Sequence, residues 1–228
     1  MTERGHSYHG LWINFEAGEG AGKSIQQKLL ADYLENRGFI VQWGREVGTT
    51  SVGEDLRRLL MDPSSPELNP KTETLLYMAG GIELFEQLIK PSLIRKEIYI
   101  TDRWRYSTTA YQGYGLGVDL SVINILTKFS CSGSYPDITF LLDIDPKLGL
   151  SKTPGNEFAG GKDKIESRGL EYHKKVNQRL REIAIQNPDR ITVIPYLEGN
   201  PCEMQAKIRQ YVEEFMEEHS LEGKLARG

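Results

Sequence analysis

The sequence predicts an α/β fold in which a five-stranded parallel sheet is flanked by helices, giving three layers. Five short runs rich in β-branched and aromatic residues alternate with longer segments of helical period. The short runs are mostly apolar on both faces, which is typical of strands buried in a parallel sheet. Strands that alternate with helices imply right-handed crossover connections. The length of 228 residues fits one large domain.

The expected elements follow one another along the chain in a regular order. The predicted strands cover residues 11–15, 39–43, 98–101, 138–142 and 191–194. The predicted helices cover residues 23–36, 56–61, 72–89, 118–129, 171–185 and 202–218. Gly38 ends the first helix, and Asp62-Pro63 ends the second. We therefore expect the domain to span residues 11–219, with a flexible N-terminal arm at 1–10 and a flexible tail at 220–228.

Composition excludes several classes of protein. The 28 Lys and Arg residues against 32 Asp and Glu give a net charge of −4, which argues against a general nucleic-acid binder. The two cysteines, Cys131 and Cys202, are too few for a disulfide scaffold or a cysteine-based zinc site and favour a reducing, cytoplasmic compartment. No apolar run reaches the roughly 20 residues that span a membrane. His6 and His9 lack a cysteine or carboxylate neighbour, so we expect a solvated arm rather than a metal site.

A glycine-rich turn follows the first predicted strand. Between that strand and a helix lies Ala17-Gly18-Glu19-Gly20-Ala21-Gly22-Lys23-Ser24. Glycines let backbone N–H groups converge on phosphate oxygens, and the helix N-terminus adds partial positive charge. We therefore expect Lys23 to neutralise the β- and γ-phosphates of ATP and Ser24 to hold Mg²⁺. The expected ATP-binding residues are Gly18, Glu19, Gly20, Ala21, Gly22, Lys23, Ser24 and Ile25. Ala17 stands where this pattern usually begins with glycine, which costs about 1–2 kcal/mol if the backbone there is left-handed.

Charged residues follow two other predicted strands at the edge where ligands bind in open α/β sheets. Asp102-Arg103 follows the predicted strand at residues 98–101, and Arg45-Glu46 follows the predicted strand at residues 39–43. We expect Asp102 to hold Mg²⁺ through water and both arginines to bind phosphate oxygens. The stretch 151–167 is glycine-containing and long enough for a mobile lid, with Lys152, Lys162 and Lys164 as candidate cations toward the phosphates.

These motifs, taken in order, resemble the thymidylate kinase family from about residue 11 to about 215. The phosphate loop matches that family, including the internal acidic Glu19. The run Arg45-Glu46-Val47-Gly48-Thr49-Thr50 is similar to its Arg-Glu-Pro-Gly-Gly-Thr turn. Asp102-Arg103-Trp104, followed by Ser107-Thr108-Thr109-Ala110-Tyr111-Gln112-Gly113, resembles its most specific segment. The resemblance implies a P-loop kinase fold, transfer of the γ-phosphate of ATP to dTMP to give dTDP, and a homodimer.

The resemblance also implies roles for particular residues. Arg45 and Arg103 would clasp the acceptor monophosphate, and Glu19 would contact the sugar 3′-hydroxyl and help to organise the metal. Tyr77 would stack on the pyrimidine, Thr108 and Gln112 would face the base, and Tyr111 would crowd the 2′ position. The expected catalytic set is Lys23, Glu19, Arg103 and Asp102, the expected acceptor set is Glu19, Arg45, Tyr77, Arg103, Thr108, Tyr111 and Gln112, and the expected metal ligands are Ser24 and Asp102.

Several positions depart from the family pattern and leave alternatives open. Gly81 stands where the family usually has an arginine that meets the base and phosphate, and Asn177 stands where it has another. Loss of the arginine at position 81 opens room at the base. This favours a second hypothesis, in which the acceptor is another deoxypyrimidine monophosphate, base-modified nucleotides included. A third hypothesis is a nucleotide-binding protein that has lost catalysis. The intact residues Lys23, Ser24, Asp102 and Arg103 argue against it. A GTPase is disfavoured because the chain has no Asn-Lys-x-Asp segment.

Overall fold

The central sheet is parallel and five-stranded. The computed structural model describes residues 4–153 and 161–228. Its strands lie in the order β2-β3-β1-β4-β5. They are β1 (Leu11–Ala17), β2 (Val41–Arg45), β3 (Ile98–Asp102), β4 (Ile138–Asp143) and β5 (Ile191–Pro195). Because β1 pairs with both β3 and β4, the loops that follow these three strands meet at one edge of the sheet.

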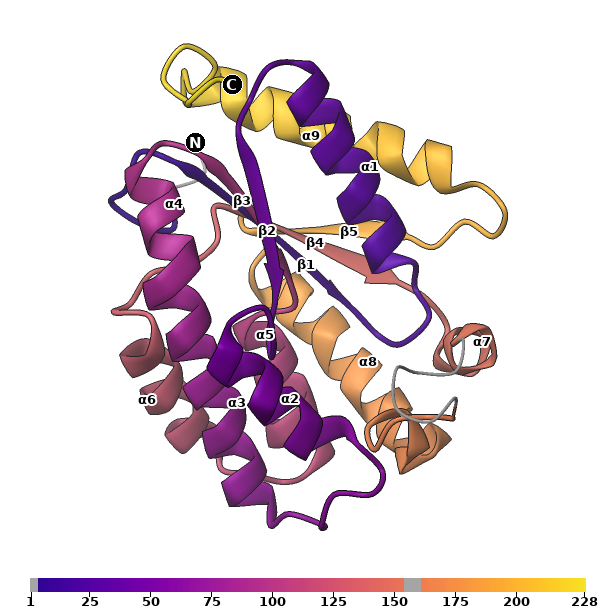
Figure 1. The fold of residues 1–228 in the computed structure, drawn as a ribbon. Coiled ribbons are helices and arrows are strands. Elements are labelled where there is room, and N and C mark those ends of the chain that lie inside the picture. The colour runs from indigo at the N-terminus through magenta and orange to yellow at the C-terminus, as the bar shows by residue number, and fades with distance from the viewer. Residues whose placement is uncertain (1–3, 154–160) are drawn as a thin grey trace.

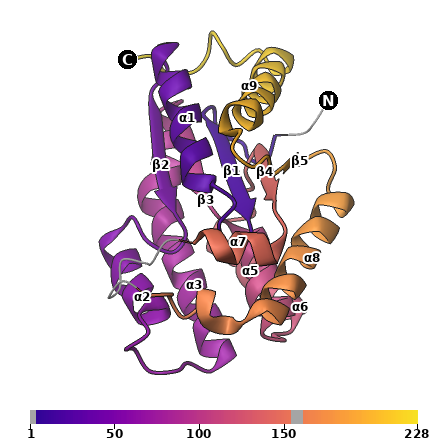
Figure 2. The same cartoon turned by 90° about the vertical axis from the view of Figure 1, so that its right-hand side faces the viewer.

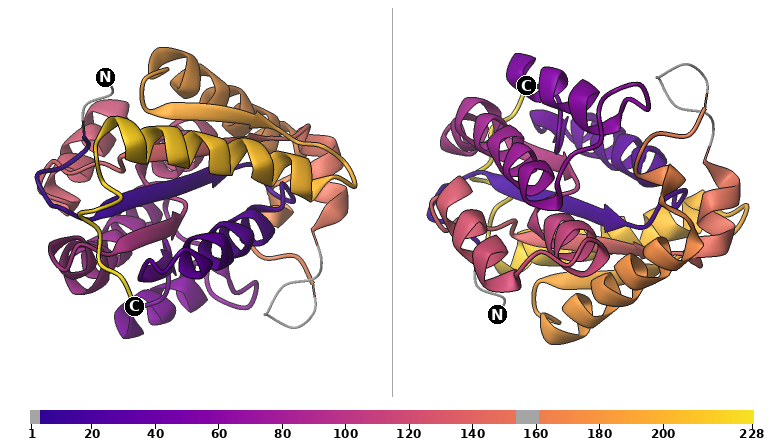
Figure 3. Two further views of the ribbon diagram at one scale, coloured as in Figure 1. Left: turned by 90° about the horizontal axis from the view of Figure 1, so that it is seen from above. Right: turned by 90° about the horizontal axis from the view of Figure 1, so that it is seen from below.

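Helices cover both faces of this sheet, as the sequence predicts. One layer contains α1 (Lys23–Asn36) and α9 (Pro201–Glu218), which pack on each other and on the strands (Figure 1). The opposite layer contains the longer α3 (Pro70–Leu84), α6 (Leu120–Ser130) and α8 (Leu170–Gln186) together with several short helices. Figure 3 shows α1 and α9 in front of the sheet from above, and α3, α6 and α8 in front of it from below.

The short helices connect the long elements near the carboxyl ends of the strands. They comprise α2 (Ser51–Met61), α4 (Lys90–Ile94), α5 (Arg105–Thr108) and α7 (Pro146–Lys152), with π-helical turns at Phe85–Ile89 and Thr109–Gly115 and a 3₁₀ turn at Glu166–Arg168. Figure 2 shows α7 and α5 just below the carboxyl end of β1. The sequence analysis did not predict α5, α7 or the 3₁₀ turn.

The side chains of β1 alternate between two cores on opposite faces of the sheet. One core is apolar, and the other also contains buried polar groups. Alternate side chains such as Ile13 and Phe15 enter the large cluster beneath α1 and α9. Trp12 enters a second cluster on the other face, together with Phe85 and Trp104. Asn14 and Glu16 point to that same face and are also fully buried. The first strand therefore supplies polar groups to the interior directly behind the loop edge.

Most predicted elements are found within a few residues of their expected bounds, but α2 begins earlier than expected. The sequence predicts a helix over 56–61, whereas α2 begins at Ser51. The side chain of Thr50 accepts a hydrogen bond from the N–H of Gly53, and this N-cap starts the helix one turn and a half earlier. The expected strand at 39–43 lies at 41–45, which brings Arg45 onto the sheet edge.

The two ends of the chain, which were expected to be flexible, pack against the domain where they are described. Arg4 Nε lies 2.8 Å from Asp137 Oδ1, and His6 Nε2 lies 3.0 Å from Asp137 Oδ2. Burial opposes ionisation of Asp137, but the nearby His6 and Arg4 lower its pKa. At the other end, Leu221 and Leu225 enter the core beneath α9. The buried carboxylate of Asp137 is the anchor that the polar composition of residues 4–10 does not reveal.

Candidate active site

The glycine-rich turn forms the expected loop between β1 and α1. Gly20 (φ 68°) and Gly22 (φ 78°) adopt left-handed conformations, which are readily available to glycine. Ala17 is the last residue of β1 and is absent from the left-handed positions, so its methyl group causes no backbone strain. The N-terminus of α1 has no side-chain cap, and its first N–H groups are available to an anion.

Two close contacts fix the position of this loop. A Cβ atom at Gly20 would clash with the carbonyl oxygen of Gly149 in α7. A Cβ atom at Gly18 would clash with Asn177 Oδ1, and Asn177 Nδ2 in turn donates to the carbonyl of Ile144 at 2.5 Å. Asn177, at a position where the sequence analysis noted a lost arginine, is buried and supports the phosphate loop from α8.

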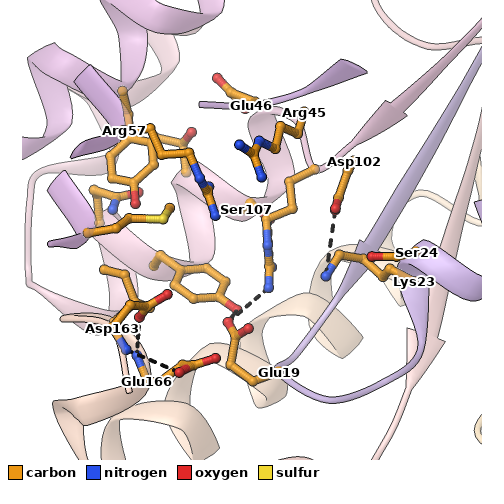
Figure 4. Close-up of a pocket in the computed structure, with 17 residues that line it drawn as sticks. Glu19, Lys23, Ser24, Arg45, Glu46, Arg57, Asp102, Ser107, Asp163 and Glu166 are labelled. Atoms are coloured by element: carbon orange, nitrogen blue, oxygen red, sulfur yellow. Dashed lines mark hydrogen bonds and ion pairs between the residues drawn. The ribbon is translucent and has the colours of Figure 1, made fainter. Parts of the chain in front are cut away.

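A cavity of about 400 Å³ lies between this loop and helices α2 and α3. Figure 4 shows Lys23, Ser24 and Asp102 on one side of it, with the guanidinium groups of Arg45 and Arg57 reaching in from the other. The lining residues are Glu19, Lys23, Ser24, Arg45, Glu46, Arg57, Met61, Tyr77, Asp102, Arg103, Ser107, Thr108, Tyr111, Gln112, Asp163, Ile165 and Glu166. All of the residues expected to bind the acceptor therefore line one space.

Glu19, Arg103 and Tyr111 form a connected polar cluster at the floor of the cavity. Arg103 Nη2 and the Tyr111 hydroxyl both donate to Glu19 Oε1, at 2.8 and 2.6 Å. Arg103 Nη1 donates to the carbonyl of Ala17 at 2.6 Å, and its guanidinium lies 4.9 Å from the centre of the Tyr111 ring. Burial opposes ionisation of Glu19, but Arg103 and Lys23 lower its pKa to about 2. The sequence analysis named these three residues, and the structure joins them.

Lys23 and Asp102 form the opposite side of the cavity. Lys23 Nζ lies 3.6 Å from Asp102 Oδ1, and both side chains are mostly buried. Asp102 Oδ1 is buried and accepts no hydrogen bond from the residues that the structure describes. Asp102, whose Oδ1 lies 3.6 Å from Lys23 Nζ, lines the same cavity as Ser24. Carboxylate and hydroxyl oxygens are ligands that Mg²⁺ prefers. The two residues expected to bind metal thus fit that role.

Two cations reach the cavity from the segment that follows β2. Arg45 Nη2 pairs with Glu54 Oε2 at 3.1 Å, and the side chain of Arg45 is about one third exposed (34%). Arg57 lies on α2, two turns after its start, and lines the cavity beside Arg45. The sequence analysis missed Arg57. The Thr50 N-cap is the signal that could have drawn attention to it, because this cap starts α2 directly after the segment that follows β2.

The remaining acceptor residues line the far end of the cavity. Tyr77 comes from α3, while Thr108 and Gln112 come from α5 and the π-helical turn that continues it. Thr108 and Gln112 are almost completely buried. Gln112 Nε2 donates to Glu73 Oε1 at 3.0 Å. One aromatic ring and two small polar groups at the end of a cationic cavity form a site suited to a flat, polar ring.

The space opposite Gly81 is occupied by a carboxyl group, which corrects one expectation. The absence of a side chain at Gly81 was expected to open room at the base. In the structure, a Cβ atom at Gly81 would lie 2.7 Å from Glu46 Oε1, and Gly81 does not line the cavity. Gly80 likewise gives close approach to Val47. The two glycines of α3 therefore accommodate the segment after β2. Gly81 does not favour an acceptor other than dTMP, because it leaves no extra room in the cavity.

Two buried carboxyl groups lie near the cavity: Glu46 lines it, and Glu16 lies outside the lining. Glu16 accepts hydrogen bonds from the backbone N–H of Trp104 and from the Ser107 hydroxyl, and burial raises its pKa. Burial and the negative charge of Glu16 raise the pKa of Glu46 to about 8, while Arg105 acts in the opposite direction. Glu46 is therefore largely protonated at neutral pH and presents a neutral group to the cavity.

Some of the predicted site residues lie away from this cavity. Gly18, Gly20, Ala21 and Gly22 form the loop beside it, and Ile25 is more than half exposed (55%) on α1. Lys152 pairs with Glu198 at 2.7 Å, and Lys164 Nζ donates to the carbonyl of Pro66 at 2.8 Å. Lys162 is exposed, and residues 154–160 of the predicted lid lie outside the described residues. The described part of the chain brings none of these three lysines to the cavity wall.

A phosphate loop at the edge of a parallel sheet, beside a cavity that three arginines line, defines a P-loop nucleotide kinase. The family model described as thymidylate kinase matches residues 15–219. The chain is 39% identical over 194 residues to the thymidylate kinase of Roseiflexus castenholzii, covering 81% of this chain and 85% of that protein. It is 38% identical over 205 residues to the thymidylate kinase of a Synechococcus strain, covering 89% and 94%.

A solved structure agrees with this assignment. The crystal structure of thymidylate kinase from Ehrlichia chaffeensis superimposes with a TM-score of 0.71 at 32% identity and covers 89% of this chain and 98% of that one. The chain belongs to the thymidylate kinase family. Among the described residues, no helix is long and apolar enough to cross a membrane.

Proposed function

We propose that this chain transfers the γ-phosphate of ATP to dTMP and releases ADP and dTDP. The observation that carries the proposal is the single cavity that places Lys23 and Ser24 opposite Arg45, Arg57 and Arg103. Phosphoryl transfer depends on alignment of two phosphate groups and neutralisation of their charge. A cavity with cations on two sides supports that chemistry, and membership of the family supports dTMP as the acceptor.

The donor phosphates would lie on the loop between β1 and α1. Its glycines let backbone N–H groups face the phosphates, and the uncapped N-terminus of α1 adds partial positive charge. Lys23 would bind the β- and γ-phosphates. The adenosine would extend away from the acceptor cavity, because the loop glycines lie beside that cavity and not within it.

The acceptor monophosphate would be held by Arg45, Arg57 and Arg103. Two unit charges of like sign at 4 Å repel by about 4 kcal/mol at an effective dielectric constant near 20, so several cations are needed to bring the phosphates together. Glu19 holds Arg103 and the Tyr111 hydroxyl in fixed positions. Since Glu19 stays ionised at neutral pH, it also offers an acceptor to the sugar hydroxyl. The acceptor is already an anion, and the site needs no strong general base.

We also propose Mg²⁺ as the metal, held by Ser24 and, through water, by Asp102. The buried Oδ1 of Asp102, which pairs with Lys23 but accepts no hydrogen bond from the described residues, supports this assignment. When bound, the ion would neutralise negative charge on the donor phosphates. Lys23 Nζ, which lies 3.6 Å from Asp102 Oδ1, would contact the phosphate oxygens directly, whereas Asp102 would hold the ion through water.

Steady-state kinetics test the proposed activity. ADP formation should require both ATP and a deoxynucleotide, and dTMP should be the preferred acceptor. Arg103→Met should raise the KM for dTMP and lower kcat/KM by roughly 100-fold or more, because it removes a buried charge-assisted contact to phosphate. Arg58→Met is the matched control, since Arg58 is exposed and pairs with Asp55 on the same helix. Equal turnover in the Arg103 variant and the control would contradict the assigned role.

We propose a homodimer that forms through α6. Val122, Ile125 and Phe129 recur at helical spacing and are 46%, 67% and 75% exposed. A row of large apolar side chains in solvent is typical of an interface. The family resemblance also implies a dimer. Light scattering should give a dimer for the wild type and a monomer for Ile125→Asp, whereas a wild-type monomer would contradict the proposal.

We propose the cytoplasm as the compartment. Cys131 is buried and Cys202 is exposed, and both are free thiols. An exposed thiol persists in a reducing compartment. Fractionation of cells that express the native protein should recover it with the cytosolic marker enzymes.

A further inference from the structure

A buried polar network lies behind Gln112, the amide at the far end of the cavity. Glu73 Oε1 accepts from Gln112 Nε2 at 3.0 Å and from Arg168 Nη1 at 3.1 Å. Glu73 Oε2 accepts from Arg168 Nη2 at 2.5 Å, which makes the ion pair bidentate. Glu73 is 4% exposed and Gln112 is 2% exposed.

This network fixes which atom of the Gln112 amide faces the cavity. A carboxylate that pairs with an arginine is acceptor-only, so the NH₂ group of Gln112 must point toward Glu73. The opposite orientation would place the amide oxygen against Glu73 Oε1, two acceptors in a buried site. The amide oxygen, which accepts no hydrogen bond from the described residues in the structure, is therefore the atom left for a ligand in the cavity, together with the second N–H.

We propose that Glu73, held by Arg168, is a positioning residue that makes the site read the 3,4-edge of the pyrimidine and reject cytosine. The proposal rests on the proposed function and extends it to the basis of acceptor choice. Thymine and uracil present a donor at N3–H and an acceptor at O4, which match the fixed oxygen and the second N–H of Gln112. Cytosine presents an acceptor at N3 and a donor at N4, and this edge places acceptor against acceptor and donor against donor.

The other member of the network connects base recognition to the end of the predicted lid. Arg168 belongs to the 3₁₀ turn Glu166–Arg168, and its guanidinium also donates to the Tyr172 hydroxyl at 2.9 Å. Glu166 in the same turn lines the cavity. The segment that follows the lid therefore carries the residue that orients Glu73, and base selection depends on that segment being in place.

Glu73→Gln tests the proposal because it keeps the shape of the side chain and allows the Gln112 amide to rotate. Calorimetry and kcat/KM are measured with dTMP, dUMP and dCMP for the wild type, for Glu73→Gln and for the control Glu86→Gln. Glu86 is exposed and pairs with Lys90 on the same helical stretch. We expect the preference for dTMP over dCMP to fall by roughly tenfold or more in Glu73→Gln, since one buried mispaired hydrogen bond has that effect. The control should keep the wild-type preference.

The ratio of kcat/KM for dTMP to kcat/KM for dUMP provides an internal control. Both bases share the N3–H and O4 edge, so this ratio should stay unchanged in Glu73→Gln. If Glu73 had a merely structural role, Glu73→Gln would weaken the binding of all three nucleotides equally. That result would overturn the proposal. If Glu73→Gln does not fold, Gln112→Leu replaces it: the preference for dTMP over dCMP should again collapse, and a retained preference would overturn the proposal.

The outcomes separate this inference from the proposed function. If the wild type phosphorylates dTMP and Glu73→Gln keeps the wild-type dTMP-to-dCMP ratio, the positioning role fails and the kinase function stands. If the wild type binds dCMP as tightly as dTMP, the edge-reading role also fails. If the wild type binds none of the three nucleotides, both proposals fail.

Discussion

Glu46 makes the stability of this domain depend on pH in an unusual direction. Burial and the charge of Glu16 raise the pKa of Glu46 from 4.5 to about 8 in the folded protein. Between these two values the folded state holds a proton that the unfolded state has lost. The contribution of Glu46 to stability is therefore fully present below about pH 4.5 and is lost as the pH rises through about 8.

The size of this effect follows from the shift. One pKa unit corresponds to about 1.4 kcal/mol, so the cost of ionising the buried carboxyl lowers the free energy of unfolding by about 3 kcal/mol between about pH 5 and about pH 8. Glu46→Gln removes the titrating group and keeps its shape against Gly81. The variant should be close to the wild type in stability at about pH 5 and more stable by about 3 kcal/mol at about pH 8.

Thermal or denaturant unfolding at the two pH values measures this difference. For a domain of this size, about 3 kcal/mol corresponds to a melting temperature higher by roughly 6–12 °C in the variant at the upper pH. Glu54→Gln is a useful comparison because Arg45 and the backbone N–H of Thr49 stabilise its charged form and lower its pKa, and burial does not outweigh them. A constant gap between wild type and Glu46→Gln across this pH range would refute the buried, protonated state.

Three further results are expected. Lys23→Met should reduce turnover by roughly 1,000-fold with little change in melting temperature, measured by ADP release and calorimetry, because its charge acts on the donor phosphates. Asp102→Asn should raise the Mg²⁺ concentration needed for half-maximal rate, and an unchanged Mg²⁺ titration would exclude Asp102 from the metal site. Gly20→Ala should destabilise more than Gly22→Ala in denaturant unfolding, because both are left-handed but only the Cβ at Gly20 meets the carbonyl of Gly149.

Much of the fold was predictable because the determining patterns are local. The strand-length apolar runs identify all five strands, and the turn from Ala17 to Ser24 places the start of α1 at Lys23, where the structure has it. Because parallel strands end at one edge, Arg45, Asp102 and Arg103 were expected near one another, and they line one cavity.

The parts that could not be predicted depend on contacts between distant segments. Arg168 and Glu73 are 95 residues apart, and their pairing depends on contact between the 3₁₀ turn Glu166–Arg168 and α3. Gly81 was interpreted as an open space, because nothing in the local sequence shows that the Glu46 carboxyl fills it. Asp137 anchors residues of the N-terminal arm from 133 positions away. A polar stretch looks solvated until its buried partner is known.

The pattern of charges explains how an acidic protein can hold two polyanions. Lys23, Arg45, Arg57 and Arg103 gather at one edge of the sheet. Among the carboxyl groups that line the same cavity, Glu19 is ionised and orients Arg103, and Asp102 pairs with Lys23. Glu46, with a pKa of about 8, adds little negative charge at neutral pH. Burial also raises the pKa values of Asp163 and Glu166, the other two acidic residues of the lining, which reduces their negative charge near the phosphates.

The central claim is that the loop at Lys23 and the guanidinium groups of Arg45, Arg57 and Arg103 bind two nucleotides at the same time. Titration calorimetry of dTMP into protein saturated with Mg²⁺ and a non-hydrolysable ATP analogue measures this directly. One dTMP should bind per chain with an affinity equal to or greater than that for the protein without the analogue. Displacement of the analogue by dTMP, or no heat of binding at all, would contradict the account.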